Sequence, residues 1–232
     1  MQTENSEIIK EEGVAPKKLA LNLPSAIVVA ALIVAGAMFM RNSDASVSGE
    51  QVVDKLDLVG EVSAADFVRG EESAPVTIIE YADFSCGYCG VYHPTLTQLV
   101  AESNGKVRWV YRHLPIFNID AAVASQCVGN IAGDKAFFDF ADMLYANKDK
   151  YSDEFYKEIA VSVGTGEAEY NTCVADPVVK NKIQKDFSQA KILLGFNATP
   201  HTIIIDKDGR KFSFAGALPY EDVKGILETL AQ

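Results

Sequence analysis

The stretch APVTIIEYADFSCGYCGVYHPTL, residues 74–96, decides the fold. Its first part, VTIIEYA at 76–82, is rich in β-branched and aromatic residues and predicts a strand. The CGYC motif follows directly and begins a segment of helical character that runs to about residue 102. A second strand is predicted at 107–114, VRWVYRHL. The chain therefore contains a βαβ unit with a CxxC motif at its first strand–helix junction.

The two cysteines of this motif, Cys86 and Cys89, have the spacing of a redox pair. Cys86 would lie at a helix N-terminus, where unpaired backbone N–H groups and the helix dipole favour an anion. The pKa of such thiols falls to roughly 3.5–7.5, which makes Cys86 a thiolate nucleophile. Cys89 lies one turn deeper and can close a disulfide with it. Two alternatives stay open: a static buried disulfide, and a metal site in which both cysteines and His93 share one helix face.

The remainder of the folded part begins with a long helical segment at 119–194. Within it, Asp176 followed by Pro177 predicts a helix start, and Gly195 predicts the end of the last helix. Two strands joined by a Lys-Asp-Gly turn and a closing amphipathic helix are expected after it, at 202–206, 211–214 and 221–231.

Together these motifs resemble the thioredoxin superfamily, and within it the DsbA-like thiol–disulfide oxidoreductases. Besides residues 74–96, the resemblance rests on YRHLP at 111–115, on Pro94 in the active-site helix and on Thr199-Pro200 before the third strand. It implies an α/β thioredoxin-like fold over 73–232, with a central mixed sheet flanked by helices and an inserted helical subdomain at about 119–194. It also implies that no organic cofactor is bound, because the Cys86–Cys89 pair is itself the redox group.

The resemblance further assigns roles to three residues around the cysteines. Pro200 would follow a cis peptide bond, face Cys86 and pair with substrate backbone, and Thr199 would then set the polarity beside Cys86. Glu80 would be a buried acid beneath the pair that moves a proton to or from Cys89. A lone acid in an apolar strand can instead point outward, and that alternative stays open for Glu80.

Aromatic residues near the motif are candidates for an apolar rim that binds unfolded substrate. Tyr88 is the substrate-binding candidate within the motif, and Phe84 and Tyr92 flank it. Phe84 fits a core position equally well. His93 is expected to be exposed on the active-site helix.

Two further cysteines, Cys127 and Cys173, lie in the helical segment outside the motif. Two thiols left over in an oxidising compartment are expected to pair as a structural disulfide. The alternative is a pair of buried free thiols.

The first 72 residues carry no part of the resemblance. Residues 1–18 read as a polar tail, and residues 19–40 carry no charge over roughly 33 Å of helix, enough for a membrane-spanning anchor. A cleaved signal peptide is the alternative. Lysines lie mainly before this segment, so the tail is expected in the cytoplasm and the large domain outside it. Residues 41–72 read as a linker, with the packed domain beginning near residue 75.

The amino-acid composition excludes some classes of protein function. The 232 residues carry 21 Lys and Arg against 32 Asp and Glu, a formal net charge of −11. This excess of acid excludes a general nucleic-acid binder. The apolar fraction of 48% and the charged fraction of 23% are those of a globular protein.

We therefore expect an extracytoplasmic thiol–disulfide oxidoreductase that acts as an oxidase on unfolded or reduced secreted proteins. It would exchange electrons with a membrane partner, either a quinone-linked oxidase or a transmembrane electron donor. The Gly-Tyr dipeptide between the cysteines resembles that of disulfide isomerases, so an isomerase or reductase is the alternative. A non-catalytic metal- or thiol-binding module is the alternative of another class.

Overall fold

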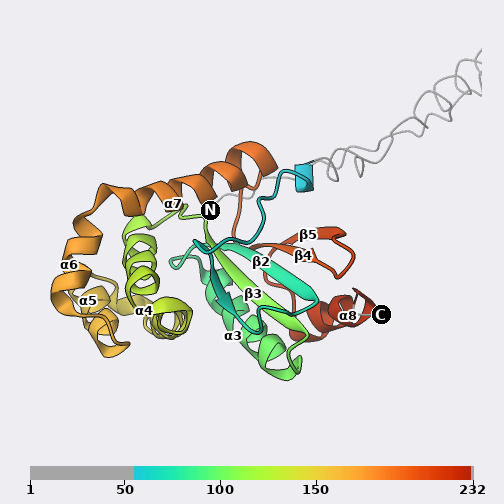
Figure 1. The fold of residues 1–232 in the computed structure, drawn as a ribbon, viewed down its shortest axis with the longest axis horizontal. Helices are drawn as coiled ribbons and strands as arrows, with labels where there is room; N and C mark the ends of the chain where they lie inside the picture. The colour runs from blue at the N-terminus through green and yellow to red at the C-terminus, as the bar shows by residue number, and fades with distance from the viewer. Residues whose placement is uncertain (1–54, 231–232) are drawn as a thin grey trace, which may run out of the picture. The chain divides into compact units, whose positions relative to one another are not determined.

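The computed structural model describes residues 55–230; residues 1–54 and 231–232 lie outside the described part. Five strands form one mixed sheet in the order β1-β3-β2-β4-β5 (Figure 1). The strands are β1 (Phe67–Arg69), β2 (Val76–Ala82), β3 (Val107–His113), β4 (His201–Ile205) and β5 (Lys211–Ala215). β2 and β3 are parallel, and the other neighbours are antiparallel. The expected α/β fold with a central mixed sheet is confirmed.

The helix α3 (Gly87–Glu102) connects β2 to β3 and completes the predicted βαβ unit. Successive side chains of β2 point to opposite faces of the sheet. Ile78 packs in the apolar cluster that includes α3 and the closing helix α8 (Tyr220–Leu230). Ile79 packs on the other face with Leu194 from the end of the helical segment. The sheet is thus covered by helical structure on both faces, and α3 carries the CxxC motif at its first turn.

The helical insertion lies between β3 and β4, as predicted. Its elements are α4 (Ile119–Ala146), the 3₁₀ turn η1 (Lys148–Lys150), α5 (Asp153–Ser162), α6 (Glu167–Ala175), α7 (Pro177–Ser188) and the π-helical turn η2 (Gln189–Leu194). Asp176 caps α7 by accepting a hydrogen bond from the Val178 N–H, which explains the Asp-Pro start signal. Gly195 ends η2 with a left-handed φ of 77°. Its position as a helix stop is confirmed.

The expected linker at 41–72 is wrong for its second part. β1 pairs antiparallel with β3, with Phe67 opposite Tyr111, and so forms the edge of the sheet. Leu56 and Val59 are buried against the sheet face that η2 covers. The stretch is largely polar, and a strand of three residues is too short to show an alternating pattern in the sequence. For these reasons the sequence did not predict β1.

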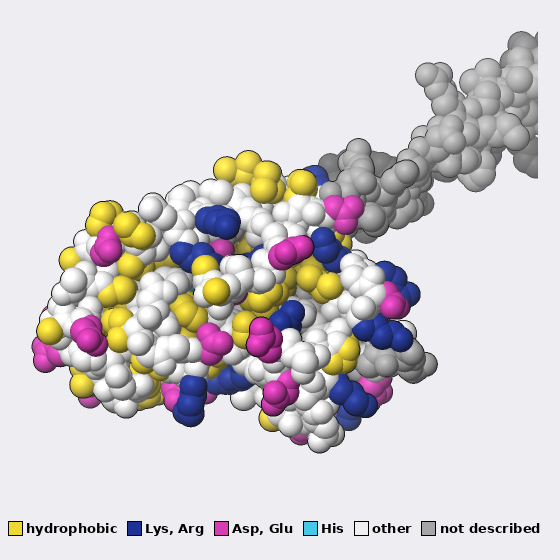
Figure 2. All heavy atoms as spheres, viewed as in Figure 1, with side chains coloured by type: hydrophobic (Ala, Val, Ile, Leu, Met, Phe, Trp, Pro, Cys, Tyr) yellow, Lys and Arg dark blue, Asp and Glu magenta, His cyan; other side chains and the backbone are white. Residues whose placement is uncertain are grey.

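The expected anchor at 19–40, the tail at 1–18 and the first part of the linker lie outside the described residues. Within residues 55–230, no helix has the length and apolar character needed to span a bilayer. On the face drawn in Figure 2, the described Lys and Arg side chains are interspersed with Asp and Glu and form no continuous basic surface.

Candidate active site: the Cys86–Cys89 pair

Cys86 occupies the N-cap position of α3, with φ −71° and ψ 127°. The turn before it is held by Asp83, whose backbone carbonyl accepts from the Cys86 N–H at 3.0 Å. The Asp83 carboxylate also accepts from the Ser85 N–H at 2.8 Å. The Cys86 carbonyl in turn accepts the first helical bond, from the Gly90 N–H at 3.3 Å. The predicted placement of the first cysteine at a helix N-terminus is therefore the one observed.

The surroundings of Cys86 favour its thiolate. A hydrogen bond from the Cys89 thiol is the largest influence, and it lowers the pKa of Cys86 to about 5 against the opposing effect of burial. The Thr199 hydroxyl and the backbone N–H groups of Cys89 and Tyr88 lower the pKa further. When protonated, the Cys86 thiol donates to the Thr199 carbonyl, with Sγ and O 3.3 Å apart. Cys86 is thus a thiolate at neutral pH whenever the pair is reduced.

Cys89 has the opposite character. It is fully buried one turn into α3, and burial, followed by its contact with Cys86 and the charge of Glu80, raises its pKa far above the ordinary value for a thiol. Both thiols are free in this structure, which corresponds to the reduced pair. One cysteine is therefore prepared to attack, and the other stays protonated until a base takes its proton.

Glu80 lies on β2 beneath the pair and is only 1% exposed. Of the two alternatives for this acid, the structure shows the buried one. Burial raises its pKa to about 8, while the nearby Trp109 indole lowers it and Cys86 raises it. Neither carboxylate oxygen meets a hydrogen-bond partner among the described residues. A carboxyl group that titrates near neutrality beside a buried thiol can transfer a proton to or from that thiol.

Thr199 and Pro200 are joined by a cis peptide bond immediately before β4. Thr199 is buried and its carbonyl faces Cys86, as the hydrogen bond above shows. The Pro200 carbonyl accepts from the Gly216 N–H at 2.9 Å and so ties this loop to the end of β5. Thr199 therefore lies against the first cysteine, and Pro200 follows it through the cis bond that the resemblance implied.

The aromatic candidates divide into exposed and buried residues. Tyr88 is 72% exposed, whereas Phe84 and Tyr92 are in the core. Phe84 stacks on Tyr111 with ring centroids 5.1 Å apart, so the core alternative holds for it. Tyr92 does not form part of a rim, because its ring is fully buried.

Sequence reasoning missed a second exposed aromatic residue beside the site, Phe117. Its N–H donates to the Asp83 carboxylate at 2.6 Å, and the same carboxylate holds Ser85. The loop after β3 is therefore fixed next to the turn that carries Cys86, and Phe117 is 72% exposed there. Val91 of α3 is also exposed, at 70%, and we call Tyr88, Val91 and Phe117 the apolar rim. No local sequence pattern could identify Phe117, because it lies 34 residues from Asp83 in the chain and only the fold brings the two together.

The expectation that His93 is exposed is wrong. It is 4% exposed, and its Nε2 lies 2.5 Å from Asp142 of α4, which also pairs with Arg69 at 2.8 Å. Burial lowers the pKa of His93, against the opposing effect of Asp142. Among residues 55–230, no group of three or more His, Cys, Asp or Glu side chains is arranged to hold a metal ion.

Cys127 and Cys173 form a disulfide that joins α4 to α6. Their Cα atoms are 5.7 Å apart, inside the normal range for a bridge. Cys127 is fully buried in the large apolar cluster that also includes residues of the sheet and of α3. The second cysteine pair is thus oxidised and remote in sequence from the first.

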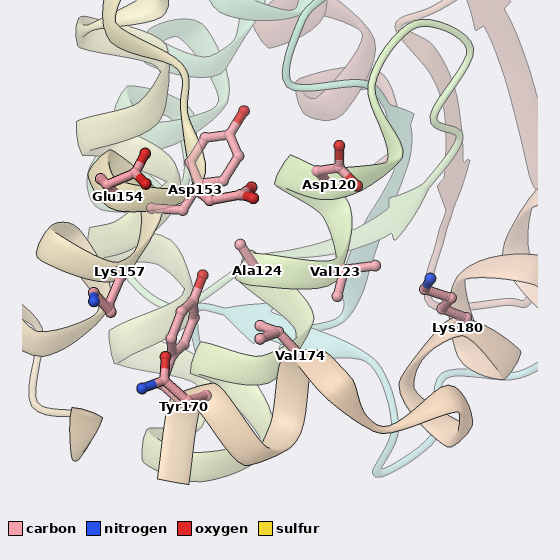
Figure 3. Close-up of a pocket in the computed structure, with 11 residues that line it drawn as sticks. Asp120, Val123, Ala124, Asp153, Glu154, Lys157, Tyr170, Val174 and Lys180 are labelled. Atoms are coloured by element: carbon pink, nitrogen blue, oxygen red, sulfur yellow. The ribbon is translucent and has the colours of Figure 1, made fainter. Parts of the chain in front are cut away.

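A hollow of about 290 Å³ lies within the helical insertion (Figure 3). It combines acidic and basic side chains, namely Asp120, Asp153, Glu154, Lys157 and Lys180. None of the four cysteines lines it, so it is separate from the thiol site.

Known proteins share the fold described above. A family model described as Thioredoxin matches residues 63–229. The crystal structure of Wolbachia pipientis α-DsbA1 is similar to this chain with a TM-score of 0.66 and 22% identity, covering 75% of this chain and 94% of that one. Pseudomonas aeruginosa DsbA2 gives a TM-score of 0.60 and 26% identity, covering 74% and 97%.

A curated relative matches over a shorter stretch. The chain is 40% identical over 87 residues to the Na(+)/H(+) antiporter NhaA 3 of Salinispora tropica, which is 37% of this chain. The chain spans only 13% of that relative's length. This match therefore concerns one part of the antiporter.

Proposed function

The chain belongs to the thioredoxin family, with the DsbA-like thiol–disulfide oxidoreductases, and on this premise we propose that it oxidises the thiols of secreted proteins outside the cytoplasm. The Cys86–Cys89 pair is the redox group. It takes two electrons from a client dithiol and is itself reduced. The S–S bond carries the chemistry, so no organic cofactor takes part.

The observation that carries this proposal is the contrast between the two thiols. The pKa of Cys86 is lowered to about 5, and that of Cys89 is raised. A stabilised thiolate lowers the free energy of the reduced pair, which makes the disulfide a stronger oxidant. The geometry of α3 therefore favours electron flow from client to enzyme.

The reaction follows from the positions of the groups. A client thiolate attacks Sγ of Cys86, the bond to Cys89 breaks, and Cys89 leaves with the electron pair and accepts a proton from Glu80. The second client thiolate then attacks the client sulfur of the mixed disulfide, and Cys86 leaves as the stabilised thiolate. The backbone edge at Thr199-Pro200 holds the client strand beside Cys86, and the apolar rim contacts its side chains.

Two features support the alternative direction. The dipeptide between the cysteines is Gly87-Tyr88, and it resembles that of disulfide isomerases. The same geometry can run in reverse, with Cys86 attacking a client disulfide and Cys89 releasing the product. An isomerase or reductase would need an electron donor across the membrane, whereas an oxidase would need a quinone-linked partner.

The location is part of the proposal. The uncharged segment at 19–40 and the lysines before it support a single membrane anchor with the catalytic domain outside. Protease added to intact spheroplasts should digest the domain. Protection from the protease would refute this orientation.

Client oxidation tests the function directly. The oxidised protein should oxidise a reduced, unfolded protein with one disulfide formed per enzyme molecule, and Cys86→Ser should be inactive. Insulin reduction with dithiothreitol serves as the opposing assay. Fast insulin reduction without client oxidation would favour the reductase alternative, and activity in neither assay would favour a binding module.

A further inference from the structure

Lys148 brings a positive charge from the helical insertion to the first turn of the active-site helix. It is the first residue of η1, and its Nζ donates to the backbone carbonyl of Cys86 at 2.5 Å. The two residues are 62 positions apart in the chain. The insertion is therefore in direct contact with the nucleophilic cysteine through a cation.

The path of this side chain depends on Gly90. A Cβ atom added at Gly90 would lie 2.6 Å from Nζ and 2.8 Å from Cε of Lys148. Glycine weakens the interior of a helix relative to alanine, so its use here has a local cost. Because Gly90 has no side chain, the ammonium group of Lys148 has room to lie over the first turn of α3.

The cysteine pair has acidic side chains near it, and Lys148 brings a positive charge to the same place. Glu80 from β2 and Asp83 from the turn before α3 are acids near the pair: besides burial, the charge of Cys86 raises the pKa of both, and the charge of Glu80 raises the pKa of Cys89. Burial lowers the pKa of Lys148, while Cys89, Cys86 and Asp83 oppose that effect. The ammonium group also lies 5.2 Å from the centre of the Tyr145 ring, which favours a cation.

Two tyrosines among the described residues also lie near the pair and are neutral at neutral pH. Tyr111 and Tyr145 pack around Cys89 from β3 and α4, and burial raises the pKa of both. Thr199 contributes its hydroxyl from the loop before β4. Lys148 thus supplies a positive charge that offsets the two acids.

We propose that Lys148 is a positioning residue of the redox pair: its ammonium group holds the Cys86 carbonyl and stabilises the thiolate that each exchange step releases. The inference rests on Cys86 and Cys89 being the redox pair of the proposed function. When client thiolate attacks Cys86, electrons pass to Cys89, and in the second step they pass to Cys86. In both steps negative charge develops on sulfur near Lys148. A cation there favours the reduced pair and so makes its disulfide more oxidising.

Two measurements on the purified full-length protein test this role. The first is the pH titration of the Cys86 thiolate by its absorbance near 240 nm, and the second is the equilibrium of the pair with glutathione. Lys148→Met should raise the pKa of Cys86 and shift the equilibrium toward the disulfide by about threefold to tenfold. Lys148→Arg should recover most of the effect, because it keeps the charge. Lys150→Met, on the same turn but packed near Phe155, should behave as wild type.

Gly90→Ala gives an independent test that keeps the lysine. Its Cβ should displace the flexible ammonium group at little cost to the fold, and alanine is the better helix former. The variant should therefore shift the Cys86 titration in the same direction as Lys148→Met.

A Lys148→Met titration that overlays wild type would overturn the proposal. So would an arginine variant that titrates like methionine, because packing rather than charge would then be responsible. The titration uses the reduced protein alone, so it remains informative even if the wild type fails to oxidise a client. That failure would refute the proposed direction and not the role of Lys148.

Discussion

The two cysteine pairs of this chain share one chemistry and occupy opposite environments. Cys86 and Cys89 lie on a single helical turn and are free thiols, whereas Cys127 and Cys173 are 46 residues apart and form a disulfide. The first pair has a helix N-terminus, a buried acid, a threonine hydroxyl and a lysine around it. The second joins two helices of the insertion. Reactivity in this protein therefore follows from the groups around the sulfur atoms, not from the presence of cysteine.

Replacing the members of the first pair should give the largest effects, and the two should fail differently. Cys86→Ser removes the nucleophile, so exchange and covalent contact with clients should both be lost. Cys89→Ser keeps the nucleophile but removes the resolving thiol, so mixed disulfides through Cys86 should accumulate. Non-reducing electrophoresis of cells that express each variant measures this. Equal trapping by both variants would contradict the division of roles.

Removing the second pair should cost stability and leave the chemistry intact. The double variant Cys127→Ser/Cys173→Ser should lose about 4 kcal/mol of unfolding free energy in the chain-entropy view of a 46-residue loop. Its folded form should still oxidise clients at nearly the wild-type rate. Denaturant unfolding of the oxidised proteins measures the first effect. A folded variant that had lost oxidase activity would show that the two pairs are not independent.

Glu80, the buried acid beneath the first pair, should affect the rate of thiol–disulfide exchange and the pH dependence of stability. In the reverse reaction, in which Cys86 attacks a peptide disulfide, Glu80→Gln should slow the release of the mixed disulfide by Cys89 by roughly tenfold to a hundredfold, because glutamine cannot take the Cys89 proton. First attack by Cys86 should change little. Stopped-flow kinetics on a peptide disulfide separate the two steps, and equal slowing of both would contradict the assignment.

The same substitution tests the linkage of Glu80 to stability. Its pKa rises from 4.5 to about 8 on folding, so the folded state holds an extra proton between these values. The unfolding free energy of the wild type should therefore fall relative to Glu80→Gln as pH rises from 4.5 through 8. The comparison is made on the oxidised proteins, in which Cys86 does not titrate. Parallel curves would show that Glu80 is ionised in the folded protein.

The apolar rim should give the smallest effect. Phe117→Ser should raise KM for an unfolded client by a few fold and leave the reaction with glutathione unchanged, since only the larger substrate reaches the rim. Ile192→Ser, an equally exposed apolar position on η2, is the control. A change in the glutathione reaction would mean that Phe117 acts on the cysteines and not on the client.

Most of the fold could be predicted from short sequence patterns. The β-branched run at 76–82, the CxxC that opens a helix and the Asp176-Pro177 start each depend on neighbours within a few residues. The cis bond at Thr199-Pro200 came from the resemblance, since a sequence pattern alone favours a trans proline. The polarity of residues 41–72 concealed β1, which gains its stability from pairing with β3.

The parts of the site that sequence reasoning missed are tertiary. His93 is buried because its ring packs between Trp109 of β3 and Tyr145 of α4, and Phe117 lies at the site because Asp83 holds its loop. Lys148 reaches Cys86 across 62 residues. Contacts between distant segments leave no local pattern, so these residues could be identified only in the folded structure.

The reduction potential of the Cys86–Cys89 pair tests the central claim most directly. It can be obtained at pH 7 from equilibrium with glutathione, by following the thiol content of each pair after alkylation. The account predicts a potential well above the ~ −270 mV of thioredoxin and toward the ~ −120 mV of strong oxidants, with the Cys127–Cys173 bridge still closed. A potential at or below about −270 mV would contradict it, because the stabilised Cys86 thiolate would then not make this pair an oxidant.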